Sequence, residues 1–139
     1  MERGRDNLTG GIREVIRWEY ARHRPAGIVR VEAVIPHTNI LAWLRAQSGF
    51  AVKVYWADRD GLDEVAGVGA ADVVVGTNSE SVESLFEQMS CRLGARATAA
   101  RYFGGMRFNR KCASDAAWGD FGGFRFVLPR FELSRRGSD

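Results

Sequence analysis

Apolar and polar residues alternate with a period of two over much of this chain. The alternation predicts strands, because successive side chains of a strand point to opposite faces of a sheet. The predicted strands are residues 27–35, 51–57, 98–108 and 122–134. The run from Leu62 to Val75 is expected to return antiparallel to residues 51–57, because Asp58–Gly61 between them has the composition of a hairpin turn.

Apolar residues at helical spacing predict helices over residues 9–22, 39–48 and from Thr77 to about Leu93. Thr38 is expected to cap the second helix, and a capping box starting at Thr77 to open the third. The stripes expected to face the core are Ile40, Leu41 and Leu44, then Val82, Leu85, Phe86, Met89 and Leu93. Mixed elements with short connections indicate an α+β fold, with an antiparallel sheet and about three helices.

Glycines and one proline interrupt the predicted strands. Gly67 and Gly69 predict a bulge or a close approach of two backbones. Gly104–Gly105 and Gly122–Gly123 lack the Lys-Ser/Thr that follows a phosphate loop, so each pair is expected to let an aromatic ring lie over the backbone. Pro129 predicts an edge position, a bulge, or a point where the strand passes from one sheet to another.

The length of 139 residues, with 45% hydrophobic residues, indicates one domain or part of one. No membrane association is expected, because no run of eighteen apolar residues is present. The charged start, Met1–Asp6, is not followed by the apolar stretch of a secretory signal. Cys91 and Cys112 are expected to be reduced thiols, although a disulfide between them stays open. These features favour the cytoplasm or an organelle interior, a plastid if the chain comes from a plant.

Charge is distributed unevenly within the net +3, since residues 91–139 carry ten Lys and Arg against four Asp and Glu. This basic part either meets an anionic ligand or forms an ordinary solvated surface. Its arginines alternate with aromatic residues, which favours the outer face of a strand, and nucleic acid is not an expected partner. Packing within a sheet is likewise favoured over base stacking for the aromatic residues Tyr102, Phe103, Phe108, Trp118, Phe121, Phe124 and Phe126.

Candidate chemistry is sparse. Four carboxylates surround the predicted hairpin: Asp58, Asp60, Asp63 and Glu64. Carboxylate oxygens hold divalent cations, but this spacing does not match an EF-hand loop, and a solvated turn is favoured. His23 and His37 are too few for a metal site. Nothing around Cys112 and its neighbour Lys111 indicates a nucleophile. No catalytic, cofactor-binding or metal-binding residue is therefore assigned.

Five blocks follow one another along the chain: His37–Gln47, Val54–Gly61, Glu64–Ala70, Tyr102–Phe108 and Phe126–Leu133. The first contains Leu-Ala-Trp-Leu-Arg-Ala-Gln and the second begins Val-Tyr-Trp. In this order they resemble a signature of isochorismate synthases, in the chorismate-binding enzyme superfamily, whose members have a leucine-x-tryptophan-leucine-x-x-glutamine helix and a tyrosine-tryptophan strand. The resemblance covers roughly residues 27–134.

The resemblance implies an enzyme that converts chorismate to isochorismate with Mg²⁺, for menaquinone, phylloquinone, salicylate or siderophore synthesis. In such enzymes a lysine is the base, an acidic residue is the acid, and glutamates hold the metal, all in the C-terminal half. The blocks found here belong to the non-catalytic N-terminal portion of a larger α/β sandwich, like that of anthranilate synthase component I. Lys53 and Lys111 do not match the family's lysine motif, so no active-site residue is carried over.

Residues 1–139 are therefore expected to form an N-terminal domain or half-domain of an isochorismate synthase, inactive alone and without bound Mg²⁺. A fragment, a split-gene product and a degenerate copy all stay open. The expected partner is the catalytic C-terminal half, on a fused or adjacent polypeptide, and uncovered strand edges favour self-association. The alternative is a non-enzymatic interaction module that binds a partner protein or an anionic ligand through the basic C-terminal part.

Overall fold

The computed structural model describes residues 9–14, 17, 28–77, 79–94, 99–108, 119 and 121–137. The chain divides into two compact units. One unit combines Met1–Thr38 with Glu87–Ala100, and the other combines Asn39–Phe86 with Arg101–Asp139. All six strands of the described residues lie in the second unit.

The strands form two antiparallel sheets of three strands each. The first sheet has the order β1 (Lys53–Ala57), β2 (Glu64–Val68), β6 (Phe131–Arg135). The second has the order β3 (Asp72–Gly76), β5 (Phe124–Leu128), β4 (Phe103–Met106). Helices accompany them at residues 9–14 and 17, at α2 (Ile40–Ala46) and at α3 (Val82–Leu93). The predicted α+β class with antiparallel pairing is confirmed, with the strands divided between two sheets.

The two labelled helices begin later than the sequence predicted. At α2, the side-chain oxygen of Asn39 accepts from the backbone N–H of Ala42 at 2.8 Å, so Asn39 is the cap. Thr38 instead donates its hydroxyl to the Pro36 carbonyl at 2.9 Å. This shift by one residue follows from competition between two adjacent residues that both suit a cap, of which asparagine ranks higher.

The capping box predicted for α3 forms ahead of the helix. Glu80 accepts from the Thr77 N–H at 3.2 Å, which is one half of the expected box, but these residues form a separate turn. Ser81 caps the helix itself, because its hydroxyl accepts from the Ser84 N–H at 3.0 Å. The helix is followed by Gly94, whose φ of 58° suits glycine.

Ile40, Leu85 and Met89 are buried, as the helical stripes predicted. Leu41 and Phe86 are 41% and 51% exposed, so their predicted burial is wrong. Each follows a buried residue directly, and consecutive helical residues point about 100° apart, which carries these two side chains out of the core.

The strand predicted over residues 27–35 is not observed in residues 28–35, the part that the structure describes. These residues have no strand pairing, and Val34 is 94% exposed. Alternation makes a segment suitable for a strand, but a strand also needs a ladder partner to bond its backbone groups.

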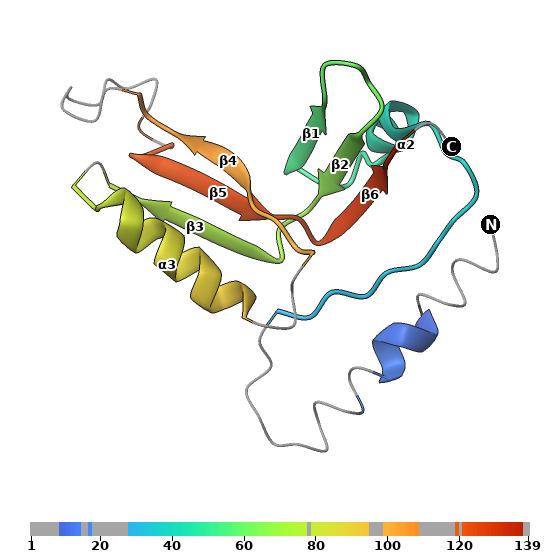
Figure 1. The fold of residues 1–139 in the computed structure, drawn as a ribbon, viewed down its shortest axis with the longest axis horizontal. Coiled ribbons are helices and arrows are strands. Elements are labelled where there is room, and N and C mark those ends of the chain that lie inside the picture. The colour runs from blue at the N-terminus through green and yellow to red at the C-terminus, as the bar shows by residue number, and fades with distance from the viewer. Residues whose placement is uncertain are drawn as a thin grey trace. The chain divides into compact units, whose positions relative to one another are not determined.

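The run from Leu62 to Val75 is two strands rather than one. It breaks after β2 at Gly69, whose φ is +68°, and continues as β3 in the other sheet. The facing run breaks at Pro129 in the same way, so β5 and β6 also lie in different sheets. The Arg130 N–H bonds the Val68 carbonyl at 3.1 Å, and the Ala71 N–H bonds that of Leu128 at 2.8 Å. These two bonds keep the crossing segments paired. Of the three alternatives that the sequence left open at Pro129, the strand order supports the change of sheet (Figure 1).

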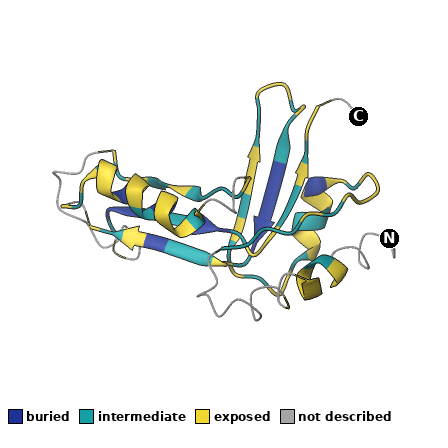
Figure 2. Ribbon diagram, turned by 60° about the horizontal axis from the view of Figure 1, so that its bottom comes forward, coloured by how far each residue is buried: buried dark blue, intermediate teal, exposed yellow. Residues whose placement is uncertain are grey.

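The core follows the central strands of both sheets. In β2, the consecutive residues from Val65 to Val68 are all buried, so this strand is covered on both faces. In the second sheet Val74, Phe124, Val127 and Leu128 are buried (Figure 2). Successive side chains of a strand point to opposite faces of the sheet. The burial of four successive residues therefore shows that β2 lies inside the unit.

Candidate functional site

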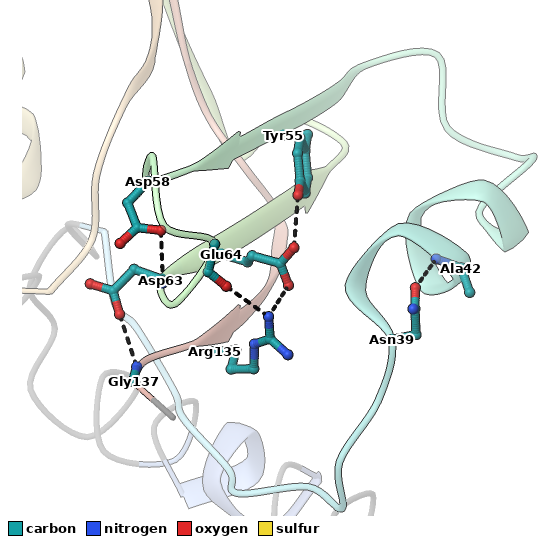
Figure 3. A network of polar contacts seen from close by, with 9 residues as sticks. Asn39, Ala42, Tyr55, Asp58, Asp63, Glu64, Arg135 and Gly137 are labelled. Carbon is teal, nitrogen blue, oxygen red and sulfur yellow. Dashed lines mark hydrogen bonds and ion pairs between the residues drawn. The ribbon is translucent and has the colours of Figure 1, made fainter. Parts of the chain in front are cut away.

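The acidic turn between β1 and β2 is the main polar cluster of the described residues (Figure 3). The Asp58 N–H donates to the Asp63 carbonyl at 3.0 Å, and the Asp63 N–H donates to Asp58 Oδ1 at 3.2 Å. Gly61, with φ of +68°, donates its N–H to the Asp58 carbonyl at 3.3 Å. The predicted hairpin is confirmed, and the side chain of Asp58 closes it.

The segment that follows β6 is tied to this turn. The Gly137 N–H donates to Asp63 Oδ1 at 3.0 Å, and the guanidinium of Arg135 donates to the Gly61 carbonyl at 3.0 Å. Positions 61 and 135 are far apart in the sequence, so these bonds fix the end of β6 against the hairpin.

Glu64 lies at the centre of the cluster. Its Oε1 accepts from the Tyr55 hydroxyl at 2.8 Å, and its Oε2 lies 2.9 Å from Nη2 of Arg135. Pairing places Glu64 between Ala57 and Arg135 across the sheet, and Tyr55 lies on the same face two pairs further along. The hydrogen bond to Glu64 raises the pKa of Tyr55, with smaller contributions from burial and from the negative charge of Glu64.

This oxygen set does not fit Mg²⁺, the ion that the resemblance implies. Both carboxylate oxygens of Glu64 are engaged, and one of them by a guanidinium cation. Asp58 and Asp63 each accept a backbone N–H. A magnesium ion requires a near-octahedral set of oxygens, and in this cluster the guanidinium of Arg135 already supplies a positive charge at Glu64. Its carboxylates join three strands and a turn.

A second polar cluster joins the two sheets at the start of β4. Arg101 Nη2 lies 3.3 Å from Glu132 Oε1 in β6, and the Tyr102 hydroxyl donates to Asp72 Oδ2 in β3 at 2.5 Å. Arg101 therefore contacts the first sheet, and the next residue, Tyr102, contacts the second. Arg101, like Arg135, forms an ion pair with a carboxylate of another strand. These two arginines of the basic C-terminal part therefore stabilise the fold.

The prediction that an aromatic ring lies over these glycine pairs is wrong at Gly105, which has no atom within 4 Å of a new Cβ, and at Gly122. A Cβ at Gly104 would collide with the Arg125 carbonyl oxygen of β5. A Cβ at Gly122, where φ is +72°, would lie 2.9 Å from the carbonyl oxygen of Gly76. Both neighbours are backbone rather than aromatic rings. The ring over a glycine occurs at Gly76 instead, where a Cβ would collide with the ring of Phe124.

The remaining candidates from the sequence differ in how far they are exposed. His37 and Lys53 are exposed, and Cys91 is a free, exposed thiol. Of the aromatic group, Phe124 is buried, Phe108 is fully exposed, and the half-buried members are Tyr102, Phe103, Phe121 and Phe126. Outside the described residues lie His23, Lys111, Cys112 and Trp118.

The residues that sequence reasoning missed are Arg101, Arg135 and the pair of Tyr102 with Asp72. Their contacts depend on strand register, and no local pattern encodes a register between strands that lie about 30 to 70 positions apart in the chain. No helix in the described residues is long and apolar enough to cross a bilayer.

Comparison with known proteins identifies a family. The family model described as chorismate binding enzyme matches residues 14–139. No curated protein and no solved structure matches the chain. The matched range contains α2, α3 and all of the strands described above.

Proposed function

This chain belongs to the chorismate-binding enzyme family, and from that premise we propose that it is the N-terminal scaffold portion of an isochorismate synthase. The reaction of such an enzyme is the conversion of chorismate to isochorismate, in which water adds to the ring and hydroxide leaves. The proposed role of this chain is to carry the sheets against which the catalytic polypeptide folds.

The observation that carries the proposal is where the five sequence blocks lie. His37–Gln47 coincides with α2, Val54–Gly61 with most of β1 and its turn, and Glu64–Ala70 with β2. Tyr102–Phe108 contains β4, and Phe126–Leu133 crosses from β5 into β6. The residues that resemble isochorismate synthases thus include α2, parts of every strand except β3, and the crossing between the two sheets.

The use of charged side chains supports a structural role. Glu64 is neutralised by Arg135, and Glu132, whose side chain is only 9% exposed, is paired with Arg101. A general acid or a metal ligand must present its oxygens to substrate or cation, whereas these carboxylates present theirs to other strands. We therefore assign the lysine base, the acid and the Mg²⁺ ligands to the catalytic polypeptide, and no step of the reaction to this chain.

A reconstitution assay tests the proposal. The 139-residue chain, the C-terminal half of an isochorismate synthase, and an equimolar mixture are each incubated with chorismate and Mg²⁺, and isochorismate is measured by chromatography. Product is expected from the mixture alone. Turnover by the chain by itself would contradict the scaffold role. Reconstitution with the catalytic half of another chorismate-utilising enzyme, but not with that of an isochorismate synthase, would assign the chain to a different enzyme of the family.

A variant with a damaged sheet serves as the matched control. Gly67→Val places a branched side chain where even a Cβ would lie 2.5 Å from Pro129, so it is expected to abolish reconstitution. Gly105→Ala, at a position with no atom within 4 Å of a new Cβ, is expected to retain it. The sequence downstream of codon 139 gives an independent check, because the proposal expects the catalytic half there or in an adjacent reading frame.

A further inference from the structure

The two faces of the second sheet, β3-β5-β4, differ in how far they are covered. Strand register places Val74, Gly76 and Phe124 on one face, where Val74 and Phe124 are each 2% exposed. On this face a Cβ at Gly76 would also collide with Glu80, in the turn before α3. Val75 points to the opposite face and is 54% exposed. This opposite face, here called the outer face, is therefore open where Val75 lies.

The outer face is apolar although part of it meets solvent. The three strands contribute to it Val73, Val75, Phe103, Gly105, Arg125 and Val127. An antiparallel sheet with one solvated face usually carries polar residues there, in alternation with an apolar inner face. Apolar residues on both faces are typical of a sheet that is covered on both sides, and exposed apolar patches mark contact sites.

Of the residues in these three strands, Arg125 is the one charged side chain on the outer face. Its neighbours across the sheet are Val75 in β3 and Gly105 in β4. Arg125 is half-buried, and in the part of the chain that the structure describes its guanidinium has no hydrogen bond or ion pair. Arg101 and Arg135, in contrast, are paired with carboxylates. The outer face therefore presents an unpaired positive charge among apolar side chains.

We propose that the outer face binds the catalytic polypeptide through an apolar segment that carries an aspartate or a glutamate opposite Arg125. An apolar partner removes water from the face, and burying a cation is costly unless an anion pairs with it. A carboxylate supplies that pair, because its two oxygens match the guanidinium of arginine. The identity of the partner rests on the proposed function, whereas its chemistry follows from the charge and the apolar character of the face.

A polypeptide suits the outer face better than a small anion does. A free carboxylate or phosphate would bind the guanidinium alone and would leave Val75 and the other apolar side chains in water. A polypeptide segment covers side chains of all three strands at once. Arginine surrounded by apolar contacts is also typical of the residues that contribute most to protein–protein affinity.

Removing the charge of Arg125 tests the contact. The 139-residue chain is titrated with the C-terminal half of an isochorismate synthase, and isothermal titration calorimetry gives the dissociation constant. Arg125→Met should raise this constant about thirtyfold or more, because it leaves the carboxylate of the partner buried without a cation. Urea denaturation of the isolated variant should show no loss of stability, because no bond to a described residue is removed. Arg59→Met, at an exposed position in the β1–β2 turn, controls for net charge and should change the constant less than about twofold.

Val75→Glu tests the same contact without removing the arginine. Residue 75 lies directly opposite Arg125, so the new carboxylate is placed to pair with the guanidinium within the chain. The carboxylate of the partner then meets a neutralised arginine and a like charge, and the dissociation constant should rise about tenfold or more. Val75→Gln, which adds a polar side chain of similar size without a charge, should raise it less.

The outcomes separate this inference from the proposed function. Failure of the unchanged chain to bind the catalytic half would contradict both. Equal dissociation constants for the unchanged chain and Arg125→Met would overturn this inference alone. An unchanged dissociation constant with a raised KM for chorismate in the reconstituted mixture would also overturn it, because that result assigns Arg125 to an anionic substrate.

Discussion

Pro129 lies directly against the bare backbone of Gly67. A Cβ at residue 67 would come 2.5 Å from Cγ of Pro129 and 2.7 Å from its Cβ. One residue is in β2 and the other lies between β5 and β6, so this contact sits where the paired strands cross from one sheet to the other. The absence of a side chain at Gly67 therefore lets the proline pack onto the sheet at the crossing.

Gly67→Ala is expected to destabilise the chain by about 1–3 kcal/mol, the usual cost of overpacking. The added methyl meets Pro129 and also Cγ2 of Val54, at 2.9 Å, so no single rotation relieves it. Urea denaturation followed by circular dichroism measures the loss. Gly105→Ala, in β4 with open space around the new methyl, should change stability by less than about 0.5 kcal/mol. A similar loss in both variants would contradict the assigned contact.

Alanine variants of Gly61 and Gly69 distinguish the cost of backbone strain from the cost of steric contact. Both have φ of +68°, but a Cβ at Gly61 meets nothing within 4 Å, whereas one at Gly69 would lie 3.1 Å from the ring of Phe50. Gly61→Ala should cost about 1–2 kcal/mol through the left-handed backbone alone. Gly69→Ala should cost more, and the excess should shrink in a Phe50→Leu background. Equal losses at the two glycines in urea denaturation would show that the Phe50 ring does not restrict the turn.

The pKa of Tyr55 is expected to lie above its ordinary value of 10.0, because the hydroxyl donates a hydrogen bond to the carboxylate of Glu64. The folded state then holds this proton more tightly than the unfolded state. Its contribution to stability is therefore complete below pH 10 and is lost as the pH rises through the raised pKa. Absorbance of tyrosinate against pH, with Tyr55→Phe subtracted, measures the pKa.

Glu64→Gln provides the control for that titration. It removes both the anionic acceptor and the negative charge that raise the pKa of Tyr55. The Tyr55 titration should then move toward lower pH, to near its ordinary value. An unchanged midpoint would mean that Glu64 is not the cause.

Tyr102→Phe tests the bond that ties the start of β4 to β3. The phenol donates to the Asp72 carboxylate at 2.5 Å in a half-buried setting. Hydrogen bonds to charged groups contribute about 1.5–3 kcal/mol, and a loss of about 1–2 kcal/mol is expected after partial exposure to solvent. Tyr55→Phe, which removes a hydroxyl from a more exposed tyrosine, should cost less. The comparison uses urea denaturation at neutral pH, and a larger loss for Tyr55→Phe would contradict the assignment.

Local signals succeeded where the chain itself dictates a conformation. Asp58–Gly61 turns because glycine adopts a positive φ and Asp58 can cap the loop with its own side chain. Pro129 marks a change of sheet because it cannot donate a ladder hydrogen bond. The family resemblance was also available from the sequence, since its blocks are contiguous runs of residues.

Local signals failed where a second segment decides the outcome. Residues 28–35 alternate like a strand but have no strand pairing. The run from Leu62 to Val75 looked continuous, yet Gly69 divides it between two sheets. The residues that contact Glu64 and Glu132 are likewise set by the register between strands. Neither polar cluster could therefore be predicted from the spacing of residues along the sequence.

The amino-acid sequence by itself determined the α+β class, the hairpin and the family, and it marked Pro129 as an interruption whose kind it left open. Tertiary structure decided which strands pair, which of the helical residues are buried, and that the acidic turn is bound by Arg135. The physical reason is the distance along the chain over which each interaction acts. Turn and cap preferences act through a few neighbouring bonds, whereas pairing and ion contacts depend on distances between segments that only the folded chain brings together.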